Sequence, residues 1–227
     1  MDIESIKSIG DYDDILINGY ISPLNKHKGI SIYQESSFID SVNMYDADGY
    51  NSIANLHLVI LGCKRDRQYT VAYADIWIIN NPLLLDIKRI QSEEIYPNIL
   101  SSNEDVERLT SVASLVAALK KEKHMSSINA AIVDKVYVYP DYRHMGISTW
   151  IHNNISDLLR KFTLITPDIV VLNYGDFSNE ALAKFNMTYE NYKKYLHNMY
   201  KNIGYKDLSV ISKLTYKSKM GLMYKLV

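Results

Sequence analysis

The sequence has one cysteine, almost no net charge and no long apolar segment, and each of these shortages excludes a class of protein. The single cysteine, Cys63, rules out an intramolecular disulfide and favours a reducing compartment. It lies in the apolar stretch "LHLVILGC", where a buried structural side chain is the simplest interpretation. Lys and Arg number 25 against 26 Asp and Glu, so no overall basic field attracts nucleic acid or an anionic membrane. A local basic patch stays open.

Membrane, export and metal signals are also missing. No apolar run approaches the roughly 20 residues of a membrane-spanning helix. The N-terminal "MDIESIKSIGDYDD" is acidic, unlike a signal peptide. The six histidines show no spacing that would place two on one helix face beside a cysteine or a carboxylate. We therefore expect a cytosolic protein with no membrane contact and no metal site.

The 227 residues are enough for one domain with a sizeable core. Residues 1–50 have no clear periodicity, and we expect irregular structure there with turns over 18–29 and a short helix over 36–45. The apolar stretches 56–65 and 69–80, separated by a short polar turn, predict a β-hairpin.

A long helix and a strand are expected next. Residues 102–123 place apolar side chains at helical spacing, and Ser102 with Asp105 resembles a capping box at the start. Residues 128–139 alternate as a strand does, and Pro140, which cannot donate to a ladder, ends it. Helical spacing resumes at Ile147.

The C-terminal part continues this alternation. "DIVVL" at 168–172 predicts a strand buried on both faces, and "NEALAKF" at 179–185 predicts a helix. The stretch 189–205 predicts another helix, in which Gly204 is placed for a left-handed C-terminal cap. Closing strands are expected over 208–216 and 220–227.

The turn between the strand ending near Tyr139 and the helix starting at Ile147 indicates an anion-binding site. A helix N-terminus fed by a strand exposes backbone N–H groups and the positive end of the helix dipole. Arg143 adds a positive charge, while Gly146 and Ser148 are small enough to let a phosphate approach. No lysine follows the last glycine as in a Walker A loop, and a Rossmann fingerprint would need three glycines.

The hexapeptide Arg143-His144-Met145-Gly146-Ile147-Ser148 resembles the pyrophosphate-binding loop of the GNAT superfamily of acyl-CoA-dependent N-acyltransferases, Arg/Gln-x-x-Gly-x-Gly/Ala, with serine in the last position. Three further segments resemble family elements in the expected order: "VDKVYVYPDYR" before the loop, "MYKNIGY" at 199–205 and the terminal "MYKLV". The resemblance covers 128–227 well and 1–127 only loosely.

The resemblance implies an α+β fold, in which a mixed, mostly antiparallel central sheet is flanked by helices. We expect one domain over 1–227, with a long helical insertion before the coenzyme-binding strand. In this family that strand and the next one splay apart, and pantetheine pairs with the open edge. Val136, Tyr137 and Val138 would then hold pantetheine, and the loop amides from Arg143 to Ser148 would hold the pyrophosphate. Asn179 would also contact the coenzyme, although it lies further from Tyr200 than in the family.

Acyl transfer to an amine requires a neutral amine and a proton for the departing thiolate. Asp134 is the candidate base, and the alternative is an ordinary surface aspartate. Tyr200 is the candidate acid, because its position before Gly204 matches the family signature and a phenol is protonated at neutral pH. The alternative for Tyr200 is packing beside Met199 and Ile203.

The predicted function is transfer of an acetyl group from acetyl-CoA to a primary amine by direct attack. Two alternatives stay open: an acyl-CoA-binding sensor or scaffold without catalysis, and an acetyltransferase that acts on a protein or an aminoacyl-tRNA. The charge balance argues against nucleic acid as a partner, and homodimer formation is left open. The sequence does not identify the acceptor.

Overall fold

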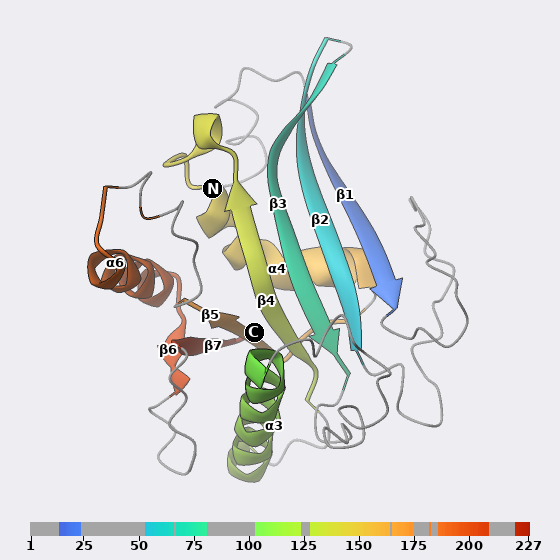
Figure 1. The fold of residues 1–227 in the computed structure, drawn as a ribbon. Helices are drawn as coiled ribbons and strands as arrows, with labels where there is room; N and C mark the ends of the chain where they lie inside the picture. The colour runs from blue at the N-terminus through green and yellow to red at the C-terminus, as the bar shows by residue number, and fades with distance from the viewer. Residues whose placement is uncertain are drawn as a thin grey trace. The chain divides into compact units, whose positions relative to one another are not determined.

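The chain divides into two compact units, each built from two separate stretches of sequence. Unit 1 comprises residues 1–79 and 133–167, and unit 2 comprises 80–132 and 168–227. Figure 1 traces both in the computed structural model. The structure describes residues 14–23, 53–65, 67–80, 103–123, 128–163, 165–174, 182, 186–208 and 221–227.

The described strands form a seven-stranded sheet in the order β1-β2-β3-β4-β5-β7-β6. The strands are β1 (Asp14–Pro23), β2 (Ile53–Lys64), β3 (Arg67–Ile79), β4 (Ala130–Val138), β5 (Ile169–Asn173), β6 (Lys206–Asp207) and β7 (Leu222–Leu226). The helices are α3 (Asn103–Lys123), α4 (Ile147–Thr163) and α6 (Tyr189–Asn202), with a 3-10 turn η3 (Pro140–Tyr142). The four strand pairs β1/β2, β2/β3, β5/β7 and β6/β7 are antiparallel. This content confirms the expected α+β class with a mostly antiparallel sheet.

The predicted hairpin is confirmed as β2 and β3, in unit 1. Leu56, Leu58 and Ile60 of β2 are at most 2% exposed, while the residues between them are half-buried, so one face of this strand is covered. The pairing shifts by one residue between Ile60 and Leu61, where Val71 of β3 is the extra residue. This bulge sets which side chains of β3 share a face with those of β2.

The expectation of irregular structure over residues 1–50 is wrong for residues 14–23, which form β1. This strand pairs with β2 along its whole length, from Asp14 opposite Cys63 to Pro23 opposite Ala54. Asn18, Gly19 and Pro23 are residue types that favour turns. Here the pairing and packing of β1 with distant segments override that local preference. Pro23 is tolerated at the end of β1, which is an edge strand among those described.

Gly19 is buried because helix α4 lies against it. α4 carries a buried apolar face made of Ile147, Trp150, Ile151, Ile155, Leu158, Leu159 and Phe162. A Cβ atom added at Gly19 would overlap the ring of Phe162. Glycine therefore permits the close approach of α4 to β1 in unit 1.

We expect Gly19→Ala to lower the free energy of unfolding by about 1–3 kcal/mol, the usual cost of overpacking a core. Urea unfolding of the full chain measures this loss. The double variant Gly19→Ala, Phe162→Leu should recover part of it, because leucine lacks the ring that the new methyl group meets. A Gly19→Ala variant as stable as wild type would show that the ring of Phe162 does not lie directly against Gly19.

In unit 2, β5 is buried on both faces, as predicted. Ile169, Val170, Val171 and Leu172 are at most 1% exposed. Asp168 anchors the start of this strand: its carboxylate accepts a 2.7 Å hydrogen bond from the amide of Asn129, and its carbonyl accepts one of 3.1 Å from the amide of Val227. The predicted last strand is confirmed as β7.

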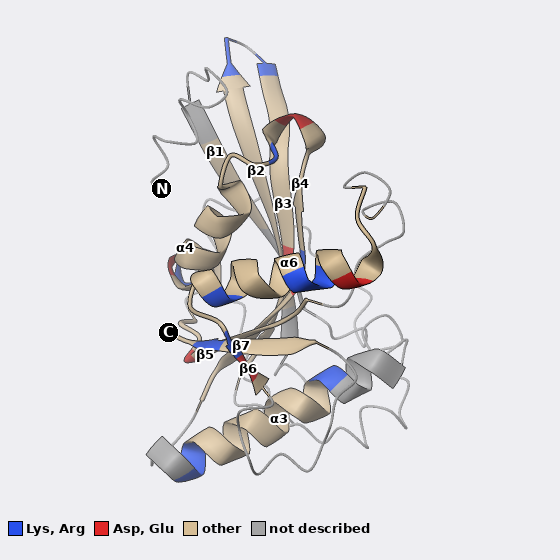
Figure 2. Ribbon diagram, turned by 90° about the vertical axis from the view of Figure 1, so that its left-hand side faces the viewer, with Lys and Arg blue, Asp and Glu red and all other residues tan. Residues whose placement is uncertain are grey.

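Helix α6 is capped at both ends. Thr188 is the N-cap and its hydroxyl accepts from the amide of Asn191. At the other end Gly204 has φ 96°, its amide donates to Lys201 O, and the amide of Tyr205 donates to Tyr200 O, which is a Schellman motif. The predicted cap at Gly204 is confirmed. Figure 2 shows an acidic residue at the N-terminal end and a basic one at the C-terminal end, as the helix dipole favours.

The predicted helix at 102–123 is confirmed as α3, with Leu109, Val112, Leu115, Val116 and Leu119 buried. The expected helix at 36–45 and the capping pair Ser102–Asp105 lie outside the described residues or side chains, as do residues 209–216 of the strand expected at 208–216. Of the helix expected at 179–185, only Leu182 is described. In the described part of the chain no helix is long and apolar enough to cross a membrane.

Candidate functional site

The predicted anion-binding turn joins β4 to α4 within unit 1. After β4 the chain makes the single 3-10 turn η3, in which the amide of Tyr142 donates to Tyr139 O at 2.9 Å and that of Arg143 to Pro140 O at 3.3 Å. Pro140 is accommodated here because the first residues of such a turn need no backbone donor. After this turn the chain continues through residues 143–146 to the N-terminus of α4.

Two residues of this turn have left-handed backbone geometry: His144 has φ 62° and Gly146 has φ 76°. Glycine adopts this conformation without steric cost, whereas a side chain at 146 would be strained. His144, Met145 and Gly146 are exposed to solvent. The turn therefore presents its backbone to solvent beside the start of α4.

α4 begins immediately after Gly146, whose carbonyl accepts from the amide of Trp150 at 2.9 Å. The N–H groups at the start of a helix lack intrahelical acceptors, and here they belong to Ile147, Ser148 and Thr149. α4 is 17 residues long and its first turn has no acidic residue. The dipole of α4 and these amides together favour an anion at this end.

Arg143 is held in place by two contacts. Its Nε donates to the carbonyl of Val138 at 3.0 Å, and its Cζ lies 5.5 Å from the centre of the Tyr137 ring. The ring favours the cation through its negative face. Arg143 thus keeps a positive charge at the end of β4, next to the turn.

β4 has two different faces near this turn. Lys135 and Tyr137 both contact Tyr73 of β3, so they point to one face of the sheet. Asp134, Val136 and Val138 alternate with them and point to the other face. The candidate base Asp134 is exposed, and Val136, Tyr137 and Val138, the candidates for holding pantetheine, are half-buried. The turn η3 connects this segment to Arg143–Ser148.

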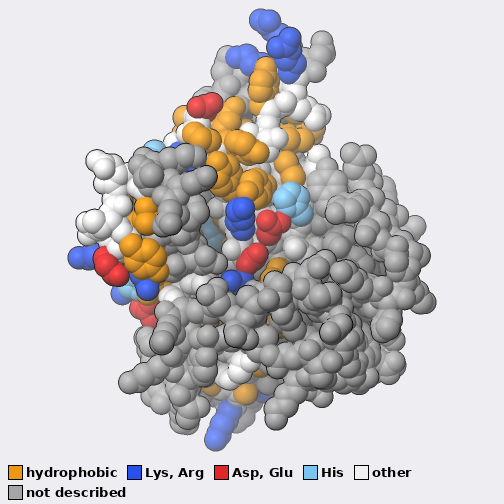
Figure 3. All heavy atoms as spheres, viewed as in Figure 1, with side chains coloured by type: hydrophobic (Ala, Val, Ile, Leu, Met, Phe, Trp, Pro, Cys, Tyr) orange, Lys and Arg blue, Asp and Glu red, His pale blue; other side chains and the backbone are white. Residues whose placement is uncertain are grey.

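Three tyrosines form a continuous aromatic surface on β3 and β4, which we name the tyrosine face: Tyr73, Tyr137 and Tyr139. The rings of Tyr73 and Tyr137 are stacked at 5.3 Å, and Tyr139 meets Tyr137 edge-on at 5.2 Å. The amide of Tyr139 donates to Val71 O, which fixes the end of β4 beside β3. Figure 3 shows hydrophobic side chains gathered over β3 and β4 on this side.

A charged group borders the tyrosine face. His57 Nδ1 lies 2.5 Å from the carboxylate of Asp75, directly across the β2/β3 ladder, and the His57 ring is 5.7 Å from that of Tyr73. Lys135 Nζ lies 5.3 Å from the centre of the Tyr73 ring. A hydrogen bond with Tyr73 is the main cause that raises the pKa of Lys135, which therefore stays cationic. No pattern in the sequence indicates that these three side chains come together.

Tyr200, the candidate acid, lies in unit 2 on α6. It is half-buried, and its ring meets that of Tyr205 at 5.9 Å. Burial raises the pKa of the Tyr200 hydroxyl, and the nearby Tyr192 adds to the shift. Tyr200 therefore keeps its proton at neutral pH. Asn179, the remaining candidate, lies outside the described residues.

Tyr205 gives a testable effect of pH on stability. It is 2% exposed, and burial, followed by Tyr200, raises the pKa of its hydroxyl. Above about pH 10 the unfolded chain loses this proton while the folded chain keeps it. The free energy of unfolding should then fall by about 1.4 kcal/mol per pH unit for this group, and be fully retained below pH 10.

We expect the free energy of unfolding of Tyr205→Phe to fall less steeply above about pH 10 than that of wild type, because the variant lacks this hydroxyl. Urea unfolding at several pH values between 9 and 11 gives the slope for both proteins. Tyr195→Phe serves as the matched control, because Tyr195 is 44% exposed on the neighbouring helix. Equal slopes for wild type and Tyr205→Phe would contradict the burial of this hydroxyl.

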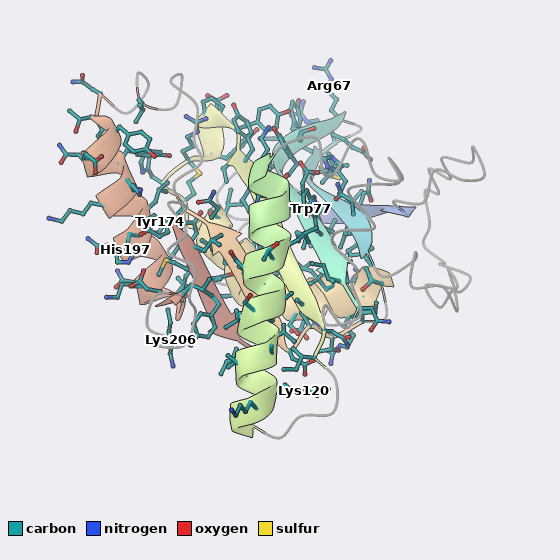
Figure 4. The ribbon with its side chains drawn as sticks, turned by 60° about the horizontal axis from the view of Figure 1, so that its bottom comes forward. Arg67, Trp77, Lys120, Tyr174, His197 and Lys206 are labelled. Atoms are coloured by element: carbon teal, nitrogen blue, oxygen red, sulfur yellow. The ribbon has the colours of Figure 1, made fainter. Side chains whose placement is uncertain are left out.

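Unit 2 also brings a second histidine to a carboxylate. His197 Nε2 lies 2.8 Å from Asp207 Oδ1, and its ring lies 5.0 Å from that of Tyr174, beside which Figure 4 shows it. Burial and then the charge of Asp207 raise the pKa of Tyr174. These contacts join α6 to β6 and to the end of β5. Among the described residues no three His, Cys, Asp or Glu side chains gather as a metal site would require.

Comparison with known proteins adds no assignment, because no family model and no curated protein matches the chain.

Proposed function

We propose that the chain is an acetyl-CoA-dependent N-acetyltransferase of GNAT type that acetylates a primary amine. The observation that carries the proposal is the turn from Arg143 to Ser148. It combines a left-handed glycine at 146, exposed backbone, a helix N-terminus without a carboxylate in its first turn and a fixed arginine. Each of these favours a bound phosphate or pyrophosphate.

The remaining roles come from the family resemblance. Val136, Tyr137 and Val138 would hold pantetheine through backbone groups, which requires that β5, the neighbour of β4 in the sheet, leaves the edge of this segment open. Tyr200 would protonate the departing thiolate, since a tyrosine hydroxyl is protonated at neutral pH. Burial raises its pKa further, which makes it a weaker acid and adds no support to this role. Asp134 is exposed and lies directly before Lys135 on β4, so it has access to solvent as a base would need.

The first test is binding of acetyl-CoA to the full chain. A ligand that binds only the folded state raises its stability by about 2.7 kcal/mol at one hundred times the Kd. We therefore expect a rise in melting temperature and measurable heat in calorimetry at millimolar acetyl-CoA. Absence of both would rule out the proposed function.

Turnover separates the enzyme from a sensor. Release of CoA thiol in the presence of an amine identifies the enzyme, whereas tight binding of acetyl-CoA without release for any amine, peptide or aminoacyl-tRNA would favour a sensor or scaffold. A transferase acting on a macromolecule would release thiol only with a protein or aminoacyl-tRNA acceptor.

A further inference from the structure

We propose that the tyrosine face, with His57, Asp75 and Lys135 at its border, binds an acyl acceptor that carries a carboxylate or phosphate beside its amine. The inference rests on the proposed function and names its substrate class. All six residues belong to unit 1, the unit that also holds the turn from Arg143 to Ser148.

The strand geometry places these side chains on one face. His57 of β2 is directly opposite Asp75 of β3, and Val59 is opposite Tyr73. Ring contacts then continue from Tyr73 to Tyr137 and Tyr139 of β4. α4 packs against the other face, since Gly19 meets Phe162 there and the alternate residues Leu56, Leu58 and Ile60 are buried. A patch of aromatic rings bordered by charges of both signs results.

The charges match a zwitterion better than a polycation. Lys135 can attract an anionic group, and the His57–Asp75 pair, which carries one negative charge when His57 is neutral, can attract an ammonium group. Lys135 interacts with the charge of Asp75, so the two signs lie close together. Tyrosine side chains add apolar contact area with polar tips for the remainder of the acceptor. A polyamine or aminoglycoside would meet Lys135 unfavourably.

For an acceptor bound on this face, His57 takes the place of Asp134 as the base, because Asp134 points to the opposite face of β4. A carboxylate only accepts hydrogen bonds, so the Nδ1 that faces Asp75 carries the hydrogen, and the neutral ring has its lone pair on Nε2. Among the described side chains, the titratable groups Tyr73 and Asp75 of β3 and Lys135 of β4 lie near it, and Tyr20 of β1 is its partner in the ladder. Asp75 acts as a positioning residue for His57.

The ammonium group of the acceptor gives one proton to His57 Nε2, and the nitrogen lone pair attacks the thioester carbonyl carbon. A C–N bond forms, the C–S bond breaks, and the departing thiolate takes up a proton as the nitrogen loses its second one. His57 then releases its proton to water.

The test compares paired acceptors with the full chain and acetyl-CoA: phenylalanine with 2-phenylethylamine, O-phosphoethanolamine with ethanolamine, and spermidine as a polycation. We expect kcat/KM to be at least about tenfold higher for the anionic member of one pair, and that pair identifies carboxylate or phosphate. Lys135→Met should lower this preference about tenfold. Lys161→Met is the matched control, because Lys161 also lies over an aromatic ring, Phe162, but on α4.

The His57–Asp75 pair is tested separately. His57→Gln should lower kcat about a hundredfold and leave the KM for acetyl-CoA unchanged, in the range of general-base effects. Asp75→Asn should likewise lower kcat while the KM for acetyl-CoA stays unchanged, and circular dichroism checks the fold of each variant. Preference for spermidine, no preference within either pair, unchanged selectivity in Lys135→Met or full turnover in His57→Gln would each overturn the inference. If wild type binds acetyl-CoA but acetylates none of these acceptors, the acceptor class is wrong; if acetyl-CoA does not bind, the proposed function itself fails.

Discussion

Gly146→Glu should abolish acetyl-CoA binding while the protein remains folded. The new carboxylate would stand at the N-terminus of α4, where the helix dipole and the amides would otherwise attract the pyrophosphate. It would also repel the phosphates directly. We expect the Kd to rise about a hundredfold or more, equivalent to about 2.8 kcal/mol. Calorimetry with acetyl-CoA measures this, and the melting temperature without ligand reports the fold.

Backbone strain must be separated from charge in this experiment. Gly146 has φ 76°, so any side chain there costs some stability. Gly146→Asn is the control, because asparagine tolerates left-handed geometry and carries no charge. It should lose less affinity than Gly146→Glu. A folded Gly146→Glu protein that binds acetyl-CoA as tightly as wild type would show that the turn is not the phosphate site.

Tyr200→Phe should lower turnover by about ten- to a thousandfold, the range of general-acid effects, with little change in the affinity for acetyl-CoA. The reason is that phenylalanine keeps the ring, which packs near Tyr205, and removes only the hydroxyl that would protonate the thiolate. Thiol release with an acceptor established by screening measures kcat, and calorimetry measures the affinity.

Tyr195→Phe is the matched control for Tyr200, because Tyr195 is an exposed tyrosine on the same helix. It should turn over at the wild-type rate. The alternative for Tyr200, packing alone, predicts full turnover in Tyr200→Phe as well. In that case the proton comes from water or from another side chain, and the match between "MYKNIGY" and the family signature has only a structural basis.

That structural basis is visible in unit 2. The spacing of Tyr200, Gly204 and Tyr205 is the spacing that a Schellman motif requires, since Tyr205 donates to Tyr200 O and Gly204 has positive φ. Sequence predicted this helix end correctly because the signal is local. Helices α3 and α4 and strands β2 to β5 and β7 were predictable for the same reason, as apolar periodicity and Pro140 mark them.

The His57–Asp75 pair could not be predicted, because it depends on a register shift. Counted from the turn, where Lys64 pairs with Arg67, an unbroken ladder would oppose His57 to Ala74. Asp75 would then point to the other face of the sheet. The bulge at Val71 moves the pairing by one residue and brings Asp75 opposite His57. No pattern in the sequence marks that extra residue.

β1 was missed for a related reason. Its residues Asn18, Gly19 and Pro23 favour turns locally, while its pairing with β2 and the contact of Gly19 with Phe162 are formed by segments far away in sequence. The candidate coenzyme residues Val136 to Ser148 are contiguous, so sequence alone could group them. The side chains of the tyrosine face come from β3 and β4 and could not be grouped in that way.

The order in which the two units are assembled from the chain affects how the protein is made. Unit 1 needs residues 133–167 in addition to 1–79, and unit 2 needs 168–227 in addition to 80–132. During translation, at roughly 5–20 residues per second, β1, β2 and β3 leave the ribosome well before β4 and α4 can cover them. For several seconds or more the buried face of the β2–β3 hairpin would lack the helix that covers it in the finished protein. Fragments that stop near residue 80 or 130 are therefore poor candidates for expression, since neither would contain all the segments of a unit.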